Sequence, residues 1–145
     1  MRIIIAAASV LFALSAPHVL ARESVTILGK KVEAKDVIGS EDSLLINGKP
    51  VHLNEHVSLG KTYKLAGGAV ALVGETSPGG YRCAPEPYVL LIRPDGSHRF
   101  DGPIETCMPY KTAQKGEQLL FETERDGRNA GQRWVWTAKA GFKKR

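Results

Sequence analysis

The sequence predicts an all-β protein, built as a single antiparallel β-sandwich or small β-barrel domain with one disulfide. Short apolar runs recur about every 10 residues between turn-forming residues, a spacing typical of such folds. No stretch carries a helical apolar period longer than two turns. With 43% hydrophobic and 24% charged residues the composition is that of a globular protein, which excludes collagen-like, disordered and polytopic membrane proteins.

Residues 1–21 are typical of a secretory signal peptide. Arg2 precedes an uncharged, mostly apolar run over Ile3–Ala16, and small residues lead to a cleavage position after Ala21. A membrane-spanning helix needs about 20 apolar residues, which disfavours an uncleaved anchor. We therefore expect one β domain over residues 22–145, located in the periplasm or secreted, with no stable membrane span after cleavage.

The first clear hairpin signal is Asn47-Gly48. It follows Leu44-Leu45-Ile46, and this residue pair favours the two-residue turn in which both central positions have positive φ. The return strand is expected over Lys49–Leu53. Because Pro50 has no amide donor, that strand should lie at the edge of a sheet.

The two expected core strands are Ala69–Val73 and Tyr88–Ile92. Each is a continuous apolar run bounded by Gly or Pro, as in strands that are covered on both faces. Arg93-Pro94-Asp95-Gly96 predicts a turn after the second strand, because proline presets φ and glycine tolerates the left-handed region. Ser97–Asp101 should then run back beside it.

A last pair of strands is expected over Gln118–Glu124 and Arg133–Ala138. Side chains alternate along a strand, so Trp134 and Trp136 should share one face. Two large rings on one face usually belong to a core. The final residues, Gly141–Arg145, are expected to fray.

The two cysteines, Cys83 and Cys107, are expected to form a disulfide. Export to an oxidising compartment favours this pairing, whereas a redox pair or a metal site lacks a C-x-x-C spacing and nearby ligands. The ring would contain 25 residues, and its closure stabilises the fold by about 3 to 4 kcal/mol in the chain-entropy treatment.

One pattern resembles a catalytic motif: His52-Leu53-Asn54-Glu55-His56 fits H-x-x-E-H, which binds zinc when it lies on a helix. On a strand the two histidines would stand about 13 Å apart, too far to share one ion. Nucleophile elbows and phosphate loops are missing from the sequence. We therefore expect no metal, no cofactor and no enzymatic activity.

Two surfaces are candidates for binding a partner. The loop that ends at Cys83 is stiffened by the disulfide and by prolines, which lowers the entropy lost on binding. The second surface is Arg133-Trp134-Val135-Trp136, where an exposed tryptophan beside arginine could anchor a partner or stack a sugar ring. Tyrosine, tryptophan and arginine are enriched at binding hot spots. The candidate contact residues are Tyr81, Arg82, Glu86, Tyr88, Arg133, Trp134 and Trp136.

The central segment carries Gly80-Tyr81-Arg82-Cys83-Ala84-Pro85 with Tyr88, Arg93-Pro94-Asp95-Gly96 and Glu105-Thr106-Cys107. It resembles small exported proteobacterial β proteins of unknown function, although Ala84 here separates the cysteine from the proline. The resemblance implies a secreted β domain with one disulfide and transfers no catalytic residue. Size and compartment are also similar to those of periplasmic lysozyme inhibitors and immunity proteins that block cell-wall hydrolases.

The positive charge is concentrated at one end of the chain. The whole sequence has a net charge of +5, and residues 125–145 contain seven basic residues and one acidic residue. The sequence favours a non-catalytic periplasmic module that binds another envelope or secreted protein, such as an inhibitor or immunity protein for a hydrolase. The alternatives are a structural or glycan-binding envelope protein that acts through the basic end, and a small hydrolase. Export disfavours nucleic acid as a partner, and homodimer formation through a sheet edge stays open.

Overall fold

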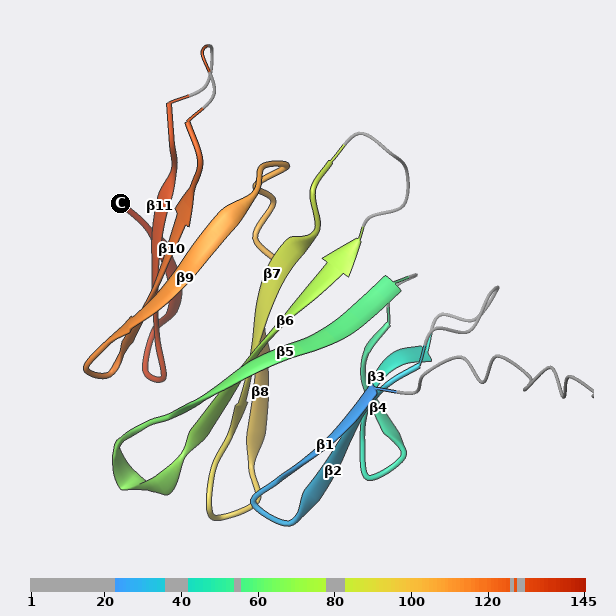
Figure 1. The fold of residues 1–145 in the computed structure, drawn as a ribbon. Helices are drawn as coiled ribbons and strands as arrows, with labels where there is room; N and C mark the ends of the chain where they lie inside the picture. Colours follow the sequence, from blue (N-terminus) through green and yellow to red (C-terminus); the bar gives the residue numbers. More distant parts are fainter. Residues whose placement is uncertain (1–22, 36–41, 54–55, 78–82, 126, 128–129) are drawn as a thin grey trace, which may run out of the picture.

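The computed structural model describes residues 23–35, 42–53, 56–77, 83–125, 127 and 130–145. They form twelve strands in three antiparallel sheets of four strands each, stacked as three layers (Figure 1). In every sheet, strands that follow one another in sequence lie side by side. The prediction of an all-β antiparallel sandwich is confirmed, and the sandwich has a third layer.

Sheet A contains the first four strands, in the order β1 (Glu23–Ile27), β2 (Lys30–Ala34), β3 (Asp42–Ile46) and β4 (Lys49–Leu53). The predicted turn joins β3 to β4, and Asn47 and Gly48 both have positive φ, 49° and 78°. The Asn47 side-chain oxygen accepts a hydrogen bond from the Lys31 amide of β2. Pro50 lies on the edge strand β4, as predicted.

Sheet B is the middle layer, in the order β5 (His56–Lys64), β6 (Val70–Ser77), β7 (Glu86–Ile92) and β8 (His98–Asp101). Every residue of β7 is buried, and most of β6 is buried, because other sheets cover both faces. This confirms the two predicted core strands. The predicted turn joins β7 to β8, where the Gly96 amide donates to the Arg93 carbonyl at 3.0 Å.

Sheet C has the order β12 (Gly141–Lys144), β11 (Arg133–Thr137), β10 (Gln118–Thr123) and β9 (Tyr110–Lys115). The predicted final strand pair is present as β10 and β11. The segment expected to fray instead forms β12, since Phe142 pairs with Trp136 and packs against the core. The flanking strand β11 and the packing of the half-buried Phe142 ring hold these residues in place. The described residues include no helix long and apolar enough to cross a bilayer.

Two separate cores lie on the two faces of sheet B. Between sheets A and B the buried side chains are mostly aliphatic, including Val32, Leu44, Leu72, Leu90 and Ile92. Between sheets B and C the core contains several aromatic rings, including Tyr63, Phe121 and Trp136. The middle sheet therefore contributes side chains to both cores, which explains why its central strands are apolar at consecutive positions.

Glycine at position 74 leaves room for the Tyr88 ring, which lies across the face of the middle sheet. Gly74 on β6 faces Tyr88 on β7, and a Cβ at Gly74 would overlap the Tyr88 ring. The ring passes over the glycine, and its hydroxyl donates to the Ser58 carbonyl on β5 at 3.0 Å. The pairing of β5 with β6 shifts register close by, between Leu59 and Thr62.

Candidate functional site

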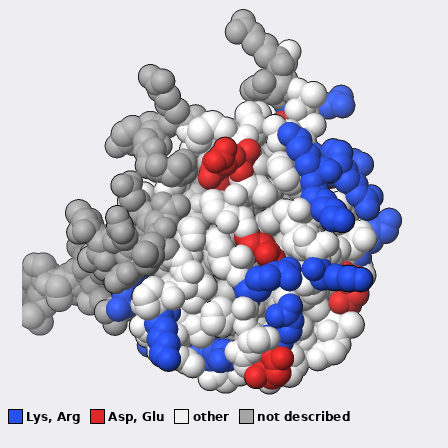
Figure 2. Space-filling model, turned by 180° about the vertical axis from the view of Figure 1, so that it is seen from behind, with Lys and Arg blue, Asp and Glu red and all other residues white. Residues whose placement is uncertain are grey.

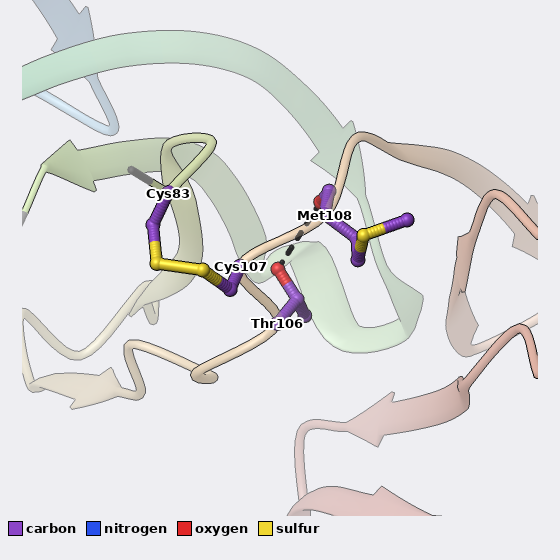
Figure 3. Close-up of a disulfide and its surroundings, with 4 residues drawn as sticks. All are labelled: Cys83, Thr106, Cys107 and Met108. Atoms are coloured by element: carbon purple, nitrogen blue, oxygen red, sulfur yellow. Dashed lines mark hydrogen bonds between the residues drawn. A yellow bond between two sulfur atoms is a disulfide. The ribbon is translucent and has the colours of Figure 1, made fainter. Parts of the chain in front are cut away.

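A disulfide joins two connections at one end of the molecule. Cys83 lies between β6 and β7, and Cys107 lies between β8 and β9, where the chain passes from sheet B to sheet C (Figure 3). Their Cα atoms are 4.3 Å apart, and the Thr106 hydroxyl donates to the Met108 carbonyl at 3.3 Å. The predicted pairing is confirmed, and it braces the crossing between two layers.

Of the predicted contact residues near this disulfide, Tyr81 and Arg82 lie outside the described residues. Tyr88 is 0% exposed in the core between sheets A and B, so its side chain cannot contact a partner in this structure. Burial, with the nearby Glu23 carboxylate, raises the pKa of the Tyr88 hydroxyl. The expectation of a surface role is wrong for Tyr88, because every position of β7 is covered.

The prediction that Glu86, on the same strand, is an exposed contact residue is also wrong. Glu86 is 7% exposed and pairs with Thr76 on β6, whose buried hydroxyl has no hydrogen-bond partner among the described residues. Burial, followed by repulsion from Glu105, raises the pKa of the Glu86 carboxyl. Glu86 is thus a largely covered carboxyl at the end of a core strand rather than an exposed contact residue.

A cleft of about 310 Å³ opens at this same end of the molecule, and residues from sheets A and B line it. Its described lining includes Glu23, His56, Glu75, Ser77 and the exposed Pro85, which lies two residues beyond Cys83. The Glu23 carboxylate accepts a hydrogen bond from the Leu59 amide at 2.7 Å. This bond ties the first strand of sheet A to β5 and fixes one wall of the cleft.

The two tryptophans share the inner face of sheet C, as predicted. Trp136 is 0% exposed, and its ring nitrogen donates to the Asp101 carboxylate on β8 at 2.8 Å. Trp134 is half-buried, and the Lys144 ammonium lies 5.4 Å from its ring centre. The prediction that Trp136 contacts a partner directly is therefore wrong, because this ring is part of the core between sheets B and C.

Arg133 remains an exposed candidate. Its side chain is 63% exposed and forms an ion pair with Glu122 across β10 and β11, at 2.8 Å. It also lines a polar pocket of about 450 Å³ together with Arg125 and Arg145, which sequence reasoning did not single out. The only sequence signal for these two residues was the basic character of the last 21 positions.

The H-x-x-E-H residues are divided between two sheets. His52 lies on β4, where its ring stacks on Phe100 with centres 4.1 Å apart, and burial lowers its pKa. His56 begins β5 in the middle sheet, and residues 54 and 55 lie outside the described residues. Within the part of the chain that the structure describes, no three His, Cys, Asp or Glu side chains gather as metal ligands would.

The comparisons with known proteins point to one family. The model of the Y4bG N-terminal domain matches residues 28–145 of this chain. The uncharacterized protein y4bG of Sinorhizobium fredii is 31% identical over 103 residues, which cover 71% of this chain and 38% of that protein. The chain therefore aligns with well under half the length of this relative. No solved structure matches.

Proposed function

Because this chain belongs to the Y4bG N-terminal domain family, we propose that it is a non-catalytic binding module that docks on another protein of the cell envelope. The match covers less than half of the longer relative, which supports a module that is joined to other segments in some proteins. Its three layers form two cores of their own, and a module with its own cores can present a surface without support from a partner.

The observation that carries this proposal is the open cleft beside the disulfide. A cleft whose rim is braced by Cys83 and Pro85 loses little conformational entropy when a partner binds. Glu23 and Glu75 give its wall negative charge, although both carboxylates already accept a hydrogen bond within the protein. The cleft is therefore suited to a projecting Lys or Arg side chain on the partner.

The finer part of the proposal concerns place and partner. We place the protein in the periplasm, after removal of residues 1–21, and we propose that its partner is a hydrolase of the cell envelope which it inhibits. The paired cysteines support an oxidising compartment. A rim that the disulfide and Pro85 stiffen is preorganised for contact with such a partner, which supports this part of the proposal.

Capture on beads from a periplasmic extract tests the docking surface. The oxidised protein is compared with Pro85→Arg, which adds bulk and positive charge at the rim, and with Lys49→Gln on the hairpin between β3 and β4. Partner binding should weaken about tenfold for the rim variant and stay unchanged for the control. Equal capture by all three proteins would remove the cleft as the docking site.

Two further measurements separate the finer claims from the docking claim. Mass spectrometry of the exported protein should find the mature chain beginning at Arg22, and an intact Met1 would contradict export. The captured partner is then assayed for cell-wall hydrolysis with and without the module. If the partner is not a hydrolase, or if the module does not change its activity, the inhibitor proposal is wrong. The proposal of a binding module is unaffected by that result.

A further inference from the structure

We propose that Arg125, Arg133 and Arg145 form a binding site for a phosphate group at the loop end of the β10–β11 hairpin, where β10 ends and β11 begins. The three residues line the same polar pocket of about 450 Å³, on the layer that lies farthest from sheet A. The site is separate from the cleft beside the disulfide and shares no lining residue with it. The inference therefore does not depend on the proposed docking function.

The strand order brings the three arginines together from distant positions in the sequence. Arg133 begins β11, which lies between β10 and β12. The Arg145 amide donates to the Arg133 carbonyl at 2.8 Å, so the end of the chain is held beside the start of β11 (Figure 1). Arg125 follows β10 by two residues and approaches from the other side of β11.

Hydrogen bonds across the hairpin hold the Arg125 side of the pocket in place. The Thr123 amide donates to the Gln132 carbonyl at 2.9 Å, and the Gln132 amide donates to the Thr123 hydroxyl at 2.6 Å. A Cβ at Gly131 would lie 2.9 Å from the Thr123 carbonyl and 3.2 Å from Arg125 Cγ. The glycine thus permits a close approach of the two sides of the hairpin, next to the stem of the Arg125 side chain.

Among the described residues that line the pocket, three arginines accompany one glutamate, so positive charge predominates. Glu122 pairs with Arg133 at 2.8 Å, and among the described residues the guanidinium groups of Arg125 and Arg145 have no carboxylate partner. Lys111 lies opposite Glu122 on β9 and adds further positive charge. Seen from behind, Lys and Arg side chains gather along the side of the molecule where sheet C lies (Figure 2). Such a concentration of charge favours an anion.

The shape and bonding of the pocket favour phosphate among anions. A guanidinium group offers a planar fork of N–H donors that matches two oxygens of a phosphate, and three such groups can serve one multiply charged anion. Gln132 also has a buried side-chain oxygen for which no hydrogen-bond partner is found among the described residues. A hydrogen phosphate, or a phosphate ester with a neighbouring hydroxyl, offers the O–H donor that this oxygen lacks.

The first test titrates the oxidised full chain with inorganic phosphate at constant ionic strength and follows backbone amides by NMR. Saturable shifts should appear at Gly131 and Gln132, and an equal concentration of chloride should not reproduce them. Arg125→Gln and Arg145→Gln should each weaken binding about tenfold. Glu122→Gln removes the one carboxylate side chain among the described lining residues and should tighten binding roughly two- to fivefold.

Lys49→Gln on sheet A is the matched control, because it removes one exposed positive charge far from the pocket. It should leave the phosphate affinity unchanged, and an unchanged urea midpoint for every variant shows that each one folds. Binding that is not saturable, or that falls equally in Lys49→Gln and Arg125→Gln, overturns the site. So does a Glu122→Gln variant that binds phosphate more weakly.

Further arms of the experiment identify the carrier of the phosphate. Vesicles of phosphatidylcholine with about one third phosphatidylglycerol are compared with pure phosphatidylcholine vesicles, and glucose 6-phosphate serves as the soluble ester. Vesicle binding that is lost in Arg145→Gln and competed by phosphate assigns a lipid headgroup. Binding of the soluble ester without vesicle binding assigns a soluble phosphate. Vesicle binding that neither Arg145→Gln nor phosphate reduces overturns the pocket as the site.

Discussion

The two faces of the middle sheet are buried by different kinds of side chain. Toward sheet A the partners are branched aliphatic groups such as Val32, Leu44 and Ile46. Toward sheet C most of them are rings, and Phe121, Trp136 and the half-buried Phe142 pack there beside the aliphatic Leu119. Large rings bury more area for each residue than aliphatic groups do. Sheet C is therefore held by fewer and larger side chains than sheet A.

The polar contacts across the two interfaces also differ. Toward sheet C, carboxylates of the middle sheet accept hydrogen bonds from rings, as Asp101 does from Trp136 and Glu75 from the Tyr110 hydroxyl at 2.8 Å. Toward sheet A, the Glu23 carboxylate instead accepts a hydrogen bond from the Leu59 backbone amide. A bond to a charged acceptor is directional and costs free energy when it is broken. Among the described residues, three such bonds join sheet C to the middle sheet, including one from the Ala66 amide to Glu117, whereas one joins sheet A. The position of sheet C is thus specified by more polar contacts than that of sheet A.

The largest effect should come from Trp136→Ala in the core between sheets B and C. It deletes a fully buried ring and a hydrogen bond to Asp101, and we expect a loss of about 3–5 kcal/mol in the free energy of unfolding. Leu44→Ala in the other core removes fewer atoms and no hydrogen bond, so it should cost less. Urea unfolding measures both. A larger loss for Leu44→Ala would reverse the comparison between the two interfaces.

The disulfide should come next, because it constrains the crossing from sheet B to sheet C. Its cysteines are 24 positions apart, and replacing both Cys83 and Cys107 by serine should lower the free energy of unfolding by about 3 kcal/mol. Hydrogen exchange should then speed up in sheet C more than in sheet A. A uniform increase over all three sheets would show that the disulfide stabilises the whole fold without favouring one interface.

Gly74→Ala tests the interface with sheet A. Its new methyl group would overlap the Tyr88 ring, and the strain should cost about 1–3 kcal/mol in the free energy of unfolding. A double variant with Tyr88→Leu removes the ring, so it should show much less than the sum of the two single losses. Additive losses, measured by urea unfolding, would mean that the methyl group is strained against the Ser58 carbonyl, which would lie 2.5 Å from it, and not against the ring.

Features that depend on local backbone geometry could be predicted from the sequence. Asn47-Gly48 requires positive φ at two successive positions, and few residue pairs accept this. Pro50 cannot donate to a neighbouring strand, which assigns it to an edge. The pairing of Cys83 with Cys107 followed from their number and from the expected compartment. Each of these predictions needed only neighbouring residues or a simple count.

Features that depend on how the sheets stack could not be predicted. Tyr88 and Glu86 have the side chains of contact residues, but they lie on a strand that two other sheets cover. The pattern of apolar and polar side chains along each strand does not determine how many sheets will stack. The third sheet was therefore not predicted from the sequence. The three arginines of the proposed phosphate site meet only because β11 separates β10 from β12. Strand order is a property of the whole chain.

The smallest effect should be a pH dependence that arises at the interface with sheet A. The His52 ring stacks on Phe100, which in turn stacks on Tyr88 with ring centres 5.1 Å apart. Burial lowers the His52 pKa from its ordinary value of 6.5, so the folded protein binds the proton less readily than the unfolded chain does. Folding is therefore opposed by protonation of this residue, and its contribution to stability weakens as the pH falls through 6.5 toward the folded value.

His52→Phe keeps a flat ring against Phe100 and removes the titrating group. Between about pH 7.5 and pH 5.5 the urea midpoint of the unmodified protein should fall more steeply than that of the variant, because only the former must exclude a proton from this ring. The carboxylates are the same in both proteins, so their own titration cancels in the difference. Parallel pH profiles would mean that the His52 ring stays accessible to protons in the folded protein. In that case the interface with sheet A would be looser at β4 than the stacked rings indicate, and the contrast with the tightly specified sheet C would become larger.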